Sequence, residues 1–139
     1  MVRAEVARTK IAAASARLEQ AEAILGQPRA RFLADPQGCD LASFYLLVAI
    51  QEVLDLAAHW VADAGWPPPA DAASTFDRIA QHGEIDASLA AGLRAAAGLR
   101  NRIAHGYSGI DHARIHEEYT EGIAILRRFL AAVATAANI

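Results

Sequence analysis

Apolar side chains along this chain recur every three to four positions, and no segment of useful length alternates apolar and polar residues. The first spacing is typical of amphipathic α-helices, whereas strict alternation would indicate half-buried strands. Alanine, leucine, arginine and glutamate dominate the sequence, and all four are strong helix formers. The pattern therefore predicts an all-α fold.

Capping residues, glycines and prolines divide this pattern into segments. We expect a first helix from about residue 3 to residue 25 that stops at Gly26, and a short helical piece at "RARFLAD" after a linker around Pro28. Asp40 suits the N-cap of a second helix that Gly65 closes. The following "WPPPAD" is expected to be a rigid loop, because proline fixes its own φ and has no amide proton.

The second half of the chain carries three further capping patterns. Ser74 and Asp77 resemble a capping box for a short helix that ends at Gly83. Asp86 is expected to cap a helix that ends near residue 105, and Asp111 to cap a last helix that ends near residue 137. The prediction is an up-and-down four-helix bundle plus one short helix.

The amino-acid composition limits the classes of protein to which this chain can belong. A chain of 139 residues with 54% apolar and 21% charged residues can bury a core without a metal ion or a disulfide. The one cysteine, Cys39, excludes an internal disulfide and favours a reducing compartment, so we expect a cytoplasmic protein. Zinc-type spacing and a signal core are absent, and the longest apolar run, "FYLLVAI", is too short to cross a bilayer. We predict one domain over residues 1–139 with no metal, no cofactor and no membrane partner.

The predicted second helix is apolar around most of its circumference, apart from a column of Gln51, Asp55 and His59 at i, i+4 spacing. This column is either a solvated stripe or a polar row that faces a site on a neighbouring helix. The apolar surface of this helix is larger than one face packed against a core requires, so part of it is available for the interface of a symmetric dimer.

The stretch "LRNRIAHGYSGID" ends the predicted fourth helix with an unusual density of polar residues. The net charge of the chain is −3, yet four arginines between residues 94 and 114 face one acidic residue there, Asp111. The overall charge therefore does not exclude RNA as a ligand. Arg100 falls on the inward seam of its helix, where an unpaired charge is costly. We expect Arg100 to meet an anion, either Asp55 or a phosphate group of a ligand.

Asn101 and His105 share another face of this helix, where the amide could fix the tautomer of the imidazole. Five residues separate Arg100 from His105, which is roughly 140° around an ideal helix. Either the helix distorts at its end, or two chains meet and each supplies part of the site; we favour two chains. The plain alternative is a helix C-terminus capped by basic side chains, with Tyr107 as an ordinary core aromatic residue.

The octet "RNRIAHGY" forms an R-x4-H-x-Y motif, preceded by "AAAGL" and followed by "SGID". It resembles the HepT-like branch of the HEPN ribonuclease superfamily, and "SFYLLVAIQEVLDLAAHWV" is similar to the second helix of that family. The resemblance covers nearly the whole chain. It implies a HEPN-like, homodimeric and metal-independent endoribonuclease that is the toxin of a type VII toxin–antitoxin pair.

The resemblance also implies roles for individual residues. Arg100 and His105 would be catalytic in the cleavage of RNA by its own 2′-hydroxyl, with Asn101 and Asp55 in support. Tyr107 would receive AMP from the partner, an antitoxin that is an MNT-type nucleotidyltransferase.

Two other classes of function stay open. One is a non-catalytic helical partner that presents substrate or nucleotide to a nucleotidyltransferase, and the other is a structural dimerisation module. On the last helix, we expect His112 and His116 to lie on the solvated face, beside an acidic patch of Glu117, Glu118 and Glu121.

Overall fold

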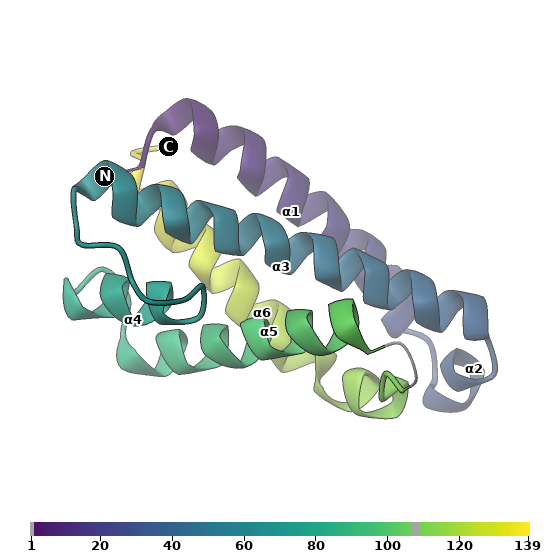
Figure 1. Ribbon diagram of the computed structural model, residues 1–139. Coiled ribbons are helices and arrows are strands. Elements are labelled where there is room, and N and C mark those ends of the chain that lie inside the picture. Colours follow the sequence, from purple (N-terminus) through teal and green to yellow (C-terminus); the bar gives the residue numbers. More distant parts are fainter. Residues whose placement is uncertain (1, 107–108) are drawn as a thin grey trace.

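Six helices make up the residues that the computed structural model describes, which are 2–106 and 109–139 (Figure 1). They are α1 (Ala4–Leu25), α2 (Arg29–Leu33), α3 (Pro36–Ala64), α4 (Ser74–Gln81), α5 (Ala87–His105) and α6 (His112–Ala136). The predicted all-α class is confirmed, since these residues contain helices and loops but no strand. Two short helices accompany the four long ones: α2 confirms the short helical piece predicted at "RARFLAD", and α4 confirms the short helix predicted after Ser74.

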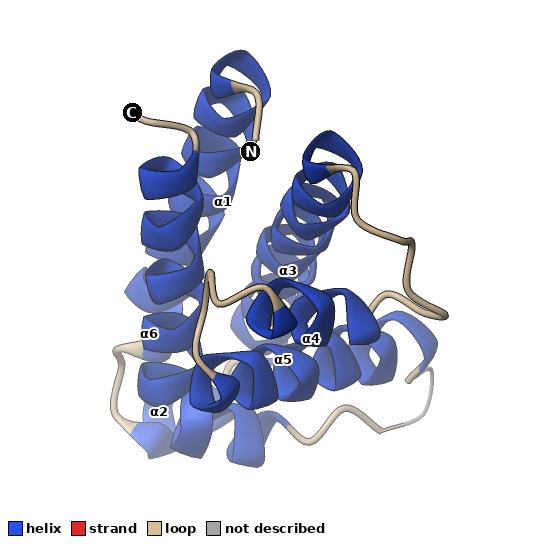
Figure 2. Ribbon diagram, turned by 90° about the vertical axis from the view of Figure 1, so that its left-hand side faces the viewer, coloured by secondary structure: helices blue, strands red, loops and turns tan. Residues whose placement is uncertain are grey.

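The long helices α1 and α3 lie side by side, and α6 packs against both (Figures 1 and 2). Figure 2 shows that α5 runs obliquely across α3 and α6, with α4 next to it. The start of α5 lies close to α4, and its end lies near the loop that leads into α6. The predicted up-and-down bundle remains a prediction, whereas the packing of four long helices around one core is observed.

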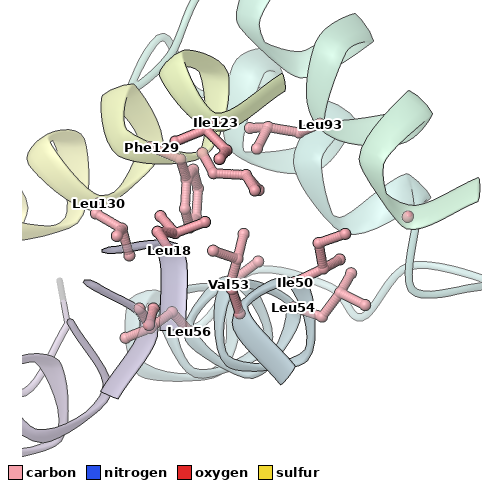
Figure 3. Close-up of a cluster of buried hydrophobic side chains, with 14 of the residues drawn as sticks. Leu18, Ile50, Val53, Leu54, Leu56, Leu93, Ile123, Phe129 and Leu130 are labelled. Carbon is pink, nitrogen blue, oxygen red and sulfur yellow. The ribbon is translucent and has the colours of Figure 1, made fainter. Parts of the chain in front are cut away.

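The core lies where these four helices meet (Figure 3). Leu18 of α1, Val53 of α3, Leu93 of α5 and Phe129 of α6 are each fully buried there. Phe76 of α4 meets the ring of Phe129 edge-on at 5.4 Å, which fixes the short helix to the same core. Burial of side chains of this size contributes about 1.5–3 kcal/mol each. The core therefore sets the rotation of α5 about its own axis, and with it the direction of each polar side chain that α5 carries.

The predicted N-cap of the second long helix was wrong. Asp40 lies inside α3, which begins at Pro36 with Asp35 as its N-cap, and the Gly38 amide donates to the Asp35 carboxylate at 3.1 Å. Proline is favourable at the first helical position, because its fixed φ suits the helix and its missing amide proton is not needed there. The predicted end of this helix is confirmed, since Gly65 closes it with φ at 74°.

The predicted capping box at Ser74 was also wrong. Ser74 is the first residue of α4 and Ala73 is its N-cap, without a side-chain cap hydrogen bond. The Ser74 amide instead donates to the carboxylate of Asp71, at the end of the proline-rich loop, at 2.8 Å. The caps predicted at Asp86 and Asp111 are confirmed. Asp86 accepts from the Leu89 amide at 2.7 Å, and this contact fixes the start of the helix that carries the motif.

Much of α3 is apolar beyond what the core covers. Its length and its mean hydropathy of 1.6 would also suit a membrane span, but half of that stretch is buried within the protein, as in the core helix of a folded domain. Leu41 and Phe44 are 44% and 49% exposed. These two side chains leave an apolar face on the N-terminal half of α3 that no described residue covers.

Candidate functional site

The last two turns of α5 carry Arg100, Asn101 and His105. The helix reaches this point because its buried positions recur at i, i+4 spacing, with Leu89 and Leu93 packed into the core. The three polar side chains therefore leave a rigidly packed helix in fixed directions. Tyr107 and Ser108 lie outside the described residues, so the predicted role of Tyr107 stays a prediction.

Arg100 is half-buried, and its Nε atom is fully buried without a hydrogen-bond partner among the described residues. The predicted ion pair between Arg100 and Asp55 was wrong. Asp55 instead accepts from Lys10 Nζ at 3.4 Å and from Gln51 Nε2 at 3.1 Å. A buried donor without a partner costs about 1–3 kcal/mol. The Nε atom of Arg78 is in the same situation. Because Nε itself is closed to solvent, an anion from outside the described chain would stabilise Arg100 through the charge of its half-buried guanidinium group.

Asp55, the middle residue of the polar column on α3, contacts α1 through Lys10. Lys10 of α1 reaches across to Glu52 at 3.1 Å as well as to Asp55. The hydrogen bond to Glu52 raises the pKa of Lys10 above its ordinary value, and the charge of Asp55 adds to this shift. The column is therefore part of an ion-pair network between α1 and α3, which explains why Asp55 is not available to Arg100.

His105 is exposed at the end of α5, and Asn101 one turn before it is exposed as well. The predicted hydrogen bond between the two side chains is not among the contacts of the described residues. Arg100 is half-buried and His105 is exposed, and the separation of the two side chains by helix geometry stays a prediction. That the two side chains meet only when two chains combine stays a prediction as well.

Gly106 ends the helix directly after His105. A Cβ atom at Gly106 would lie 2.3 Å from the carbonyl oxygen of Arg102, which is far inside van der Waals contact. The backbone is helix-bound at Arg102, so it has little freedom to yield. Glycine is therefore required for the tight departure of the chain from the helix at the point where His105 is presented.

The first turns of α6 lie closer to other helices than the sequence suggested. His112 is half-buried, with its Nδ1 atom 3.4 Å from Ser43 Oγ and its Nε2 atom 3.7 Å from the Asp40 carboxylate. His116 is also half-buried and stacks on Phe32 of α2, with ring centroids 5.2 Å apart. The predicted solvated position of both histidines was wrong, because α2 and the start of α3 cover this side of α6.

The arginines near the motif differ in their ion pairing. Arg94 binds Asp77, and Arg114 binds Glu118 at 3.1 Å. No carboxylate among the described residues lies within ion-pair distance of Arg100 or Arg102. The predicted basic face therefore reduces to two unpaired guanidinium groups, both on the turns of α5 that precede His105.

A groove of about 500 Å³ runs between α5 and α6 on the side of α5 that carries Arg102. We call it the α5–α6 groove. Its walls are mainly apolar, and its charged residues are Arg102, Asp111, Arg114, Glu118 and Glu121. The described residues contain no group of three or more histidine, cysteine, aspartate or glutamate side chains placed to hold a metal ion.

A model of the ribonuclease HepT-like family matches residues 14–133, which include α3, α5 and the motif. The chain belongs to this family. A protein of Archaeoglobus fulgidus described as a "Putative RNase" is 34% identical over 88 residues, which are 63% of this chain and 66% of that protein. The chain therefore matches slightly less than two thirds of the length of that protein.

Solved structures of HEPN toxins share the fold of this HepT-like chain. A tri-AMPylated Shewanella oneidensis HEPN toxin, in complex with MNT antitoxin, aligns with a TM-score of 0.86 at 19% identity and covers 94% of this chain and 97% of its own. A toxin–antitoxin structure with AMP-PNP aligns with a TM-score of 0.84 over 92% of this chain and 97% of its own, also at 19% identity. At this level of identity the likeness establishes the fold.

Gly106→Ala tests whether the backbone can leave α5 after His105 only when the next residue has no Cβ atom. The clash with the Arg102 carbonyl should lower the free energy of unfolding by about 1–3 kcal/mol and shift the NMR resonances of the His105 ring. Thermal unfolding and histidine-selective NMR spectra measure both effects.

Gly98→Ala is the matched control, because a Cβ at Gly98 meets its nearest neighbour, Arg102 Nη1, only at 3.4 Å. This variant lies within α5 and should be neutral or up to about 1 kcal/mol more stable through helix propensity. Equal stability of the two variants would contradict the proposed requirement at Gly106.

Proposed function

We propose that this HepT-like protein is the toxin of a toxin–antitoxin pair and acts as a metal-independent endoribonuclease in the cytoplasm, as a homodimer of one helical domain over residues 1–139. The observation that carries the proposal is the half-buried Arg100 with an unpartnered Nε, on the same helix end as the exposed His105. A phosphate group of RNA provides the anion that the described residues do not offer to Arg100.

The proposed chemistry uses the nucleophile that RNA itself carries. His105 removes the proton of the 2′-hydroxyl, and the 2′-oxygen attacks the adjacent phosphorus. The bond to the 5′-oxygen breaks, and an imidazolium, the partner subunit's His105, returns a proton to that oxygen. Arg100 binds the phosphoryl oxygens while negative charge builds on them. The products are a 2′,3′-cyclic phosphate and a free 5′-hydroxyl, and no step requires a divalent metal.

A second copy of the chain resolves the geometry of α5. Because an ideal helix separates Arg100 and His105 by roughly 140°, a symmetric dimer is proposed to bring Arg100 of one protomer and His105 of the other to the same phosphate. The exposed apolar face of α3 with Leu41 and Phe44 is the surface that such a dimer would bury.

The proposed partner is an MNT-type nucleotidyltransferase, which transfers AMP to Tyr107. The modification would add bulk and a negative phosphate two residues after His105, where it would compete with RNA for the unpaired arginines. This part of the proposal is supported by the solved HEPN toxin that carries AMP and is bound to its MNT antitoxin.

His105→Ala should abolish RNA cleavage, with turnover reduced at least about 100-fold because general acid–base catalysis is lost. The assay uses purified protein and labelled RNA in the presence of EDTA, and it detects cyclic-phosphate ends. His82→Ala is the matched control, because His82 is the C-cap of α4, and α4 lies beside the start of α5 whereas the motif lies at its end (Figure 1). Equal activity of wild-type and His105→Ala proteins, or inactivity of both, would contradict the ribonuclease proposal and favour a non-catalytic partner of a nucleotidyltransferase.

Co-expression with the cognate nucleotidyltransferase should raise the intact mass of the protein by one or more AMP units and suppress its toxicity. Tyr107→Phe should remove the mass gain, since the acceptor hydroxyl is missing, and should leave the toxicity of the protein unchecked by modification. Intact mass spectrometry and growth curves measure these effects. A mass gain that persists in Tyr107→Phe would contradict Tyr107 as the modified residue.

A further inference from the structure

Two glycine residues, which have no side chain, shape the α5–α6 groove. A Cβ atom at Gly92 would lie 2.7 Å from Ile125 Cδ1, so α5 and α6 are in close contact at that point. A Cβ atom at Gly122 would meet nothing within 4 Å, so the groove is open along this part of α6. Its volume of about 500 Å³ falls within the range of pockets that hold small ligands.

The lining suits a flat apolar group attached to a charged one. Leu99 and Ile103 of α5 face Ile115 and Tyr119 of α6 across the groove. Aliphatic and aromatic walls of this kind accept the faces of a nucleobase. The charged residues of the lining are Arg102 and Arg114 together with the carboxylates of Asp111, Glu118 and Glu121. Arg114 is paired with Glu118, so Arg102 is the cation of the lining that has no ion-pair partner among the described residues and is available to a phosphate.

The groove adjoins the proposed catalytic group. Arg102 precedes His105 by three residues, so the two side chains are neighbours on the surface of α5. The guanidinium of Arg102 folds back over Gly98, with Nη1 3.4 Å from the position that a Cβ would take there. Gly109 and Asp111, which follow the motif, line the same groove. A ligand in the groove would therefore lie next to the phosphate on which His105 acts.

We infer that the α5–α6 groove is a nucleoside subsite, which rests on the proposed ribonuclease function. One base and ribose of the RNA occupy the apolar walls, and Arg102 neutralises the phosphate attached to that nucleoside. This assigns Arg102 to substrate binding, separately from Arg100, which holds the scissile phosphate. The base in the groove gives the enzyme a means to prefer one cleavage position over another.

A nucleoside fits this groove better than a second protein chain does. The groove is concave and narrow, because two helices wall it and small residues deepen it. A protein interface requires a broader surface than a groove between two helices, and the exposed side chains of Leu41 and Phe44 on α3 are the part of the chain that we assign to the dimer.

Gly122→Leu tests the subsite by filling the groove. The new side chain enters open space and improves helix propensity, so the variant should fold at least as well as the wild type. Ala124→Leu is the matched control, because Ala124 is exposed on the same helix and does not line the groove. The probes are the four nucleoside 3′-monophosphates, titrated into the unmodified full-length protein by NMR or calorimetry.

We expect the wild type and Ala124→Leu to bind at least one of the four nucleotides, and Gly122→Leu to bind it at least tenfold more weakly. Arg102→Gln should also weaken binding and reduce its dependence on salt. In the cleavage assay, Gly122→Leu should raise KM or remove the base preference, while His105→Ala removes turnover.

Several outcomes would overturn the subsite. One is the absence of nucleotide binding by the wild type, and another is equal binding by Gly122→Leu. Unchanged cleavage and base preference in Gly122→Leu would reject the subsite and leave the ribonuclease function standing. Loss of nucleotide binding in Gly122→Leu, together with a wild type that cleaves no RNA, would instead reject the ribonuclease function. If Gly122→Leu binds nucleotides normally but no longer associates with the nucleotidyltransferase, the groove is a protein-docking site.

Discussion

Arg100 and His105 are both carried by α5, whose rotation is fixed by the core, and the site that we propose follows from this constraint. The rotation of α5 is set by buried side chains such as Leu93, so neither polar group can turn toward the other without disturbing the core. A half-buried guanidinium without a partner is unfavourable in an isolated chain. The two-chain site that we propose removes both difficulties at once, since it gives Arg100 a phosphate and brings an imidazole to it.

The surroundings of α5 fit this arrangement. Asp55, the carboxylate expected to neutralise Arg100, is bound to Lys10 and Gln51 on the far side of α3. Gly106 lets the backbone leave the helix at once, so that His105 stands at its exposed end. The unpaired guanidinium groups and the glycine position that tolerates no Cβ atom both lower the stability of this region. Such local costs are typical of functional sites.

Local features of the sequence predicted the elements well. The caps at Asp86 and Asp111 and the left-handed glycine at Gly65 each depend on a few neighbouring residues, so they were predicted correctly. The start of α3 could have been found as well, because Asp35 followed by proline is a stronger helix start than Asp40.

Contacts between distant segments were not predictable in this way. Asp55 pairs with Lys10 because α1, and not α5, lies along that face of α3, and helix spacing contains no information about which helix is the neighbour. His116 is half-buried because Phe32 of the short α2 stacks on it. The α5–α6 groove arises from the crossing of two helices at Gly92, which the sequence shows only as one glycine among nine.

The most direct test of the two-chain site is the ribonuclease activity of a purified heterodimer. One protomer is wild-type, the other carries both Arg100→Ala and His105→Ala, and two different affinity tags select the mixed species. If each site needs groups from both protomers, the mixed dimer should be at least about 100-fold less active than the wild type. Activity near half of the wild-type value, which independent sites within single chains would give, would contradict this account.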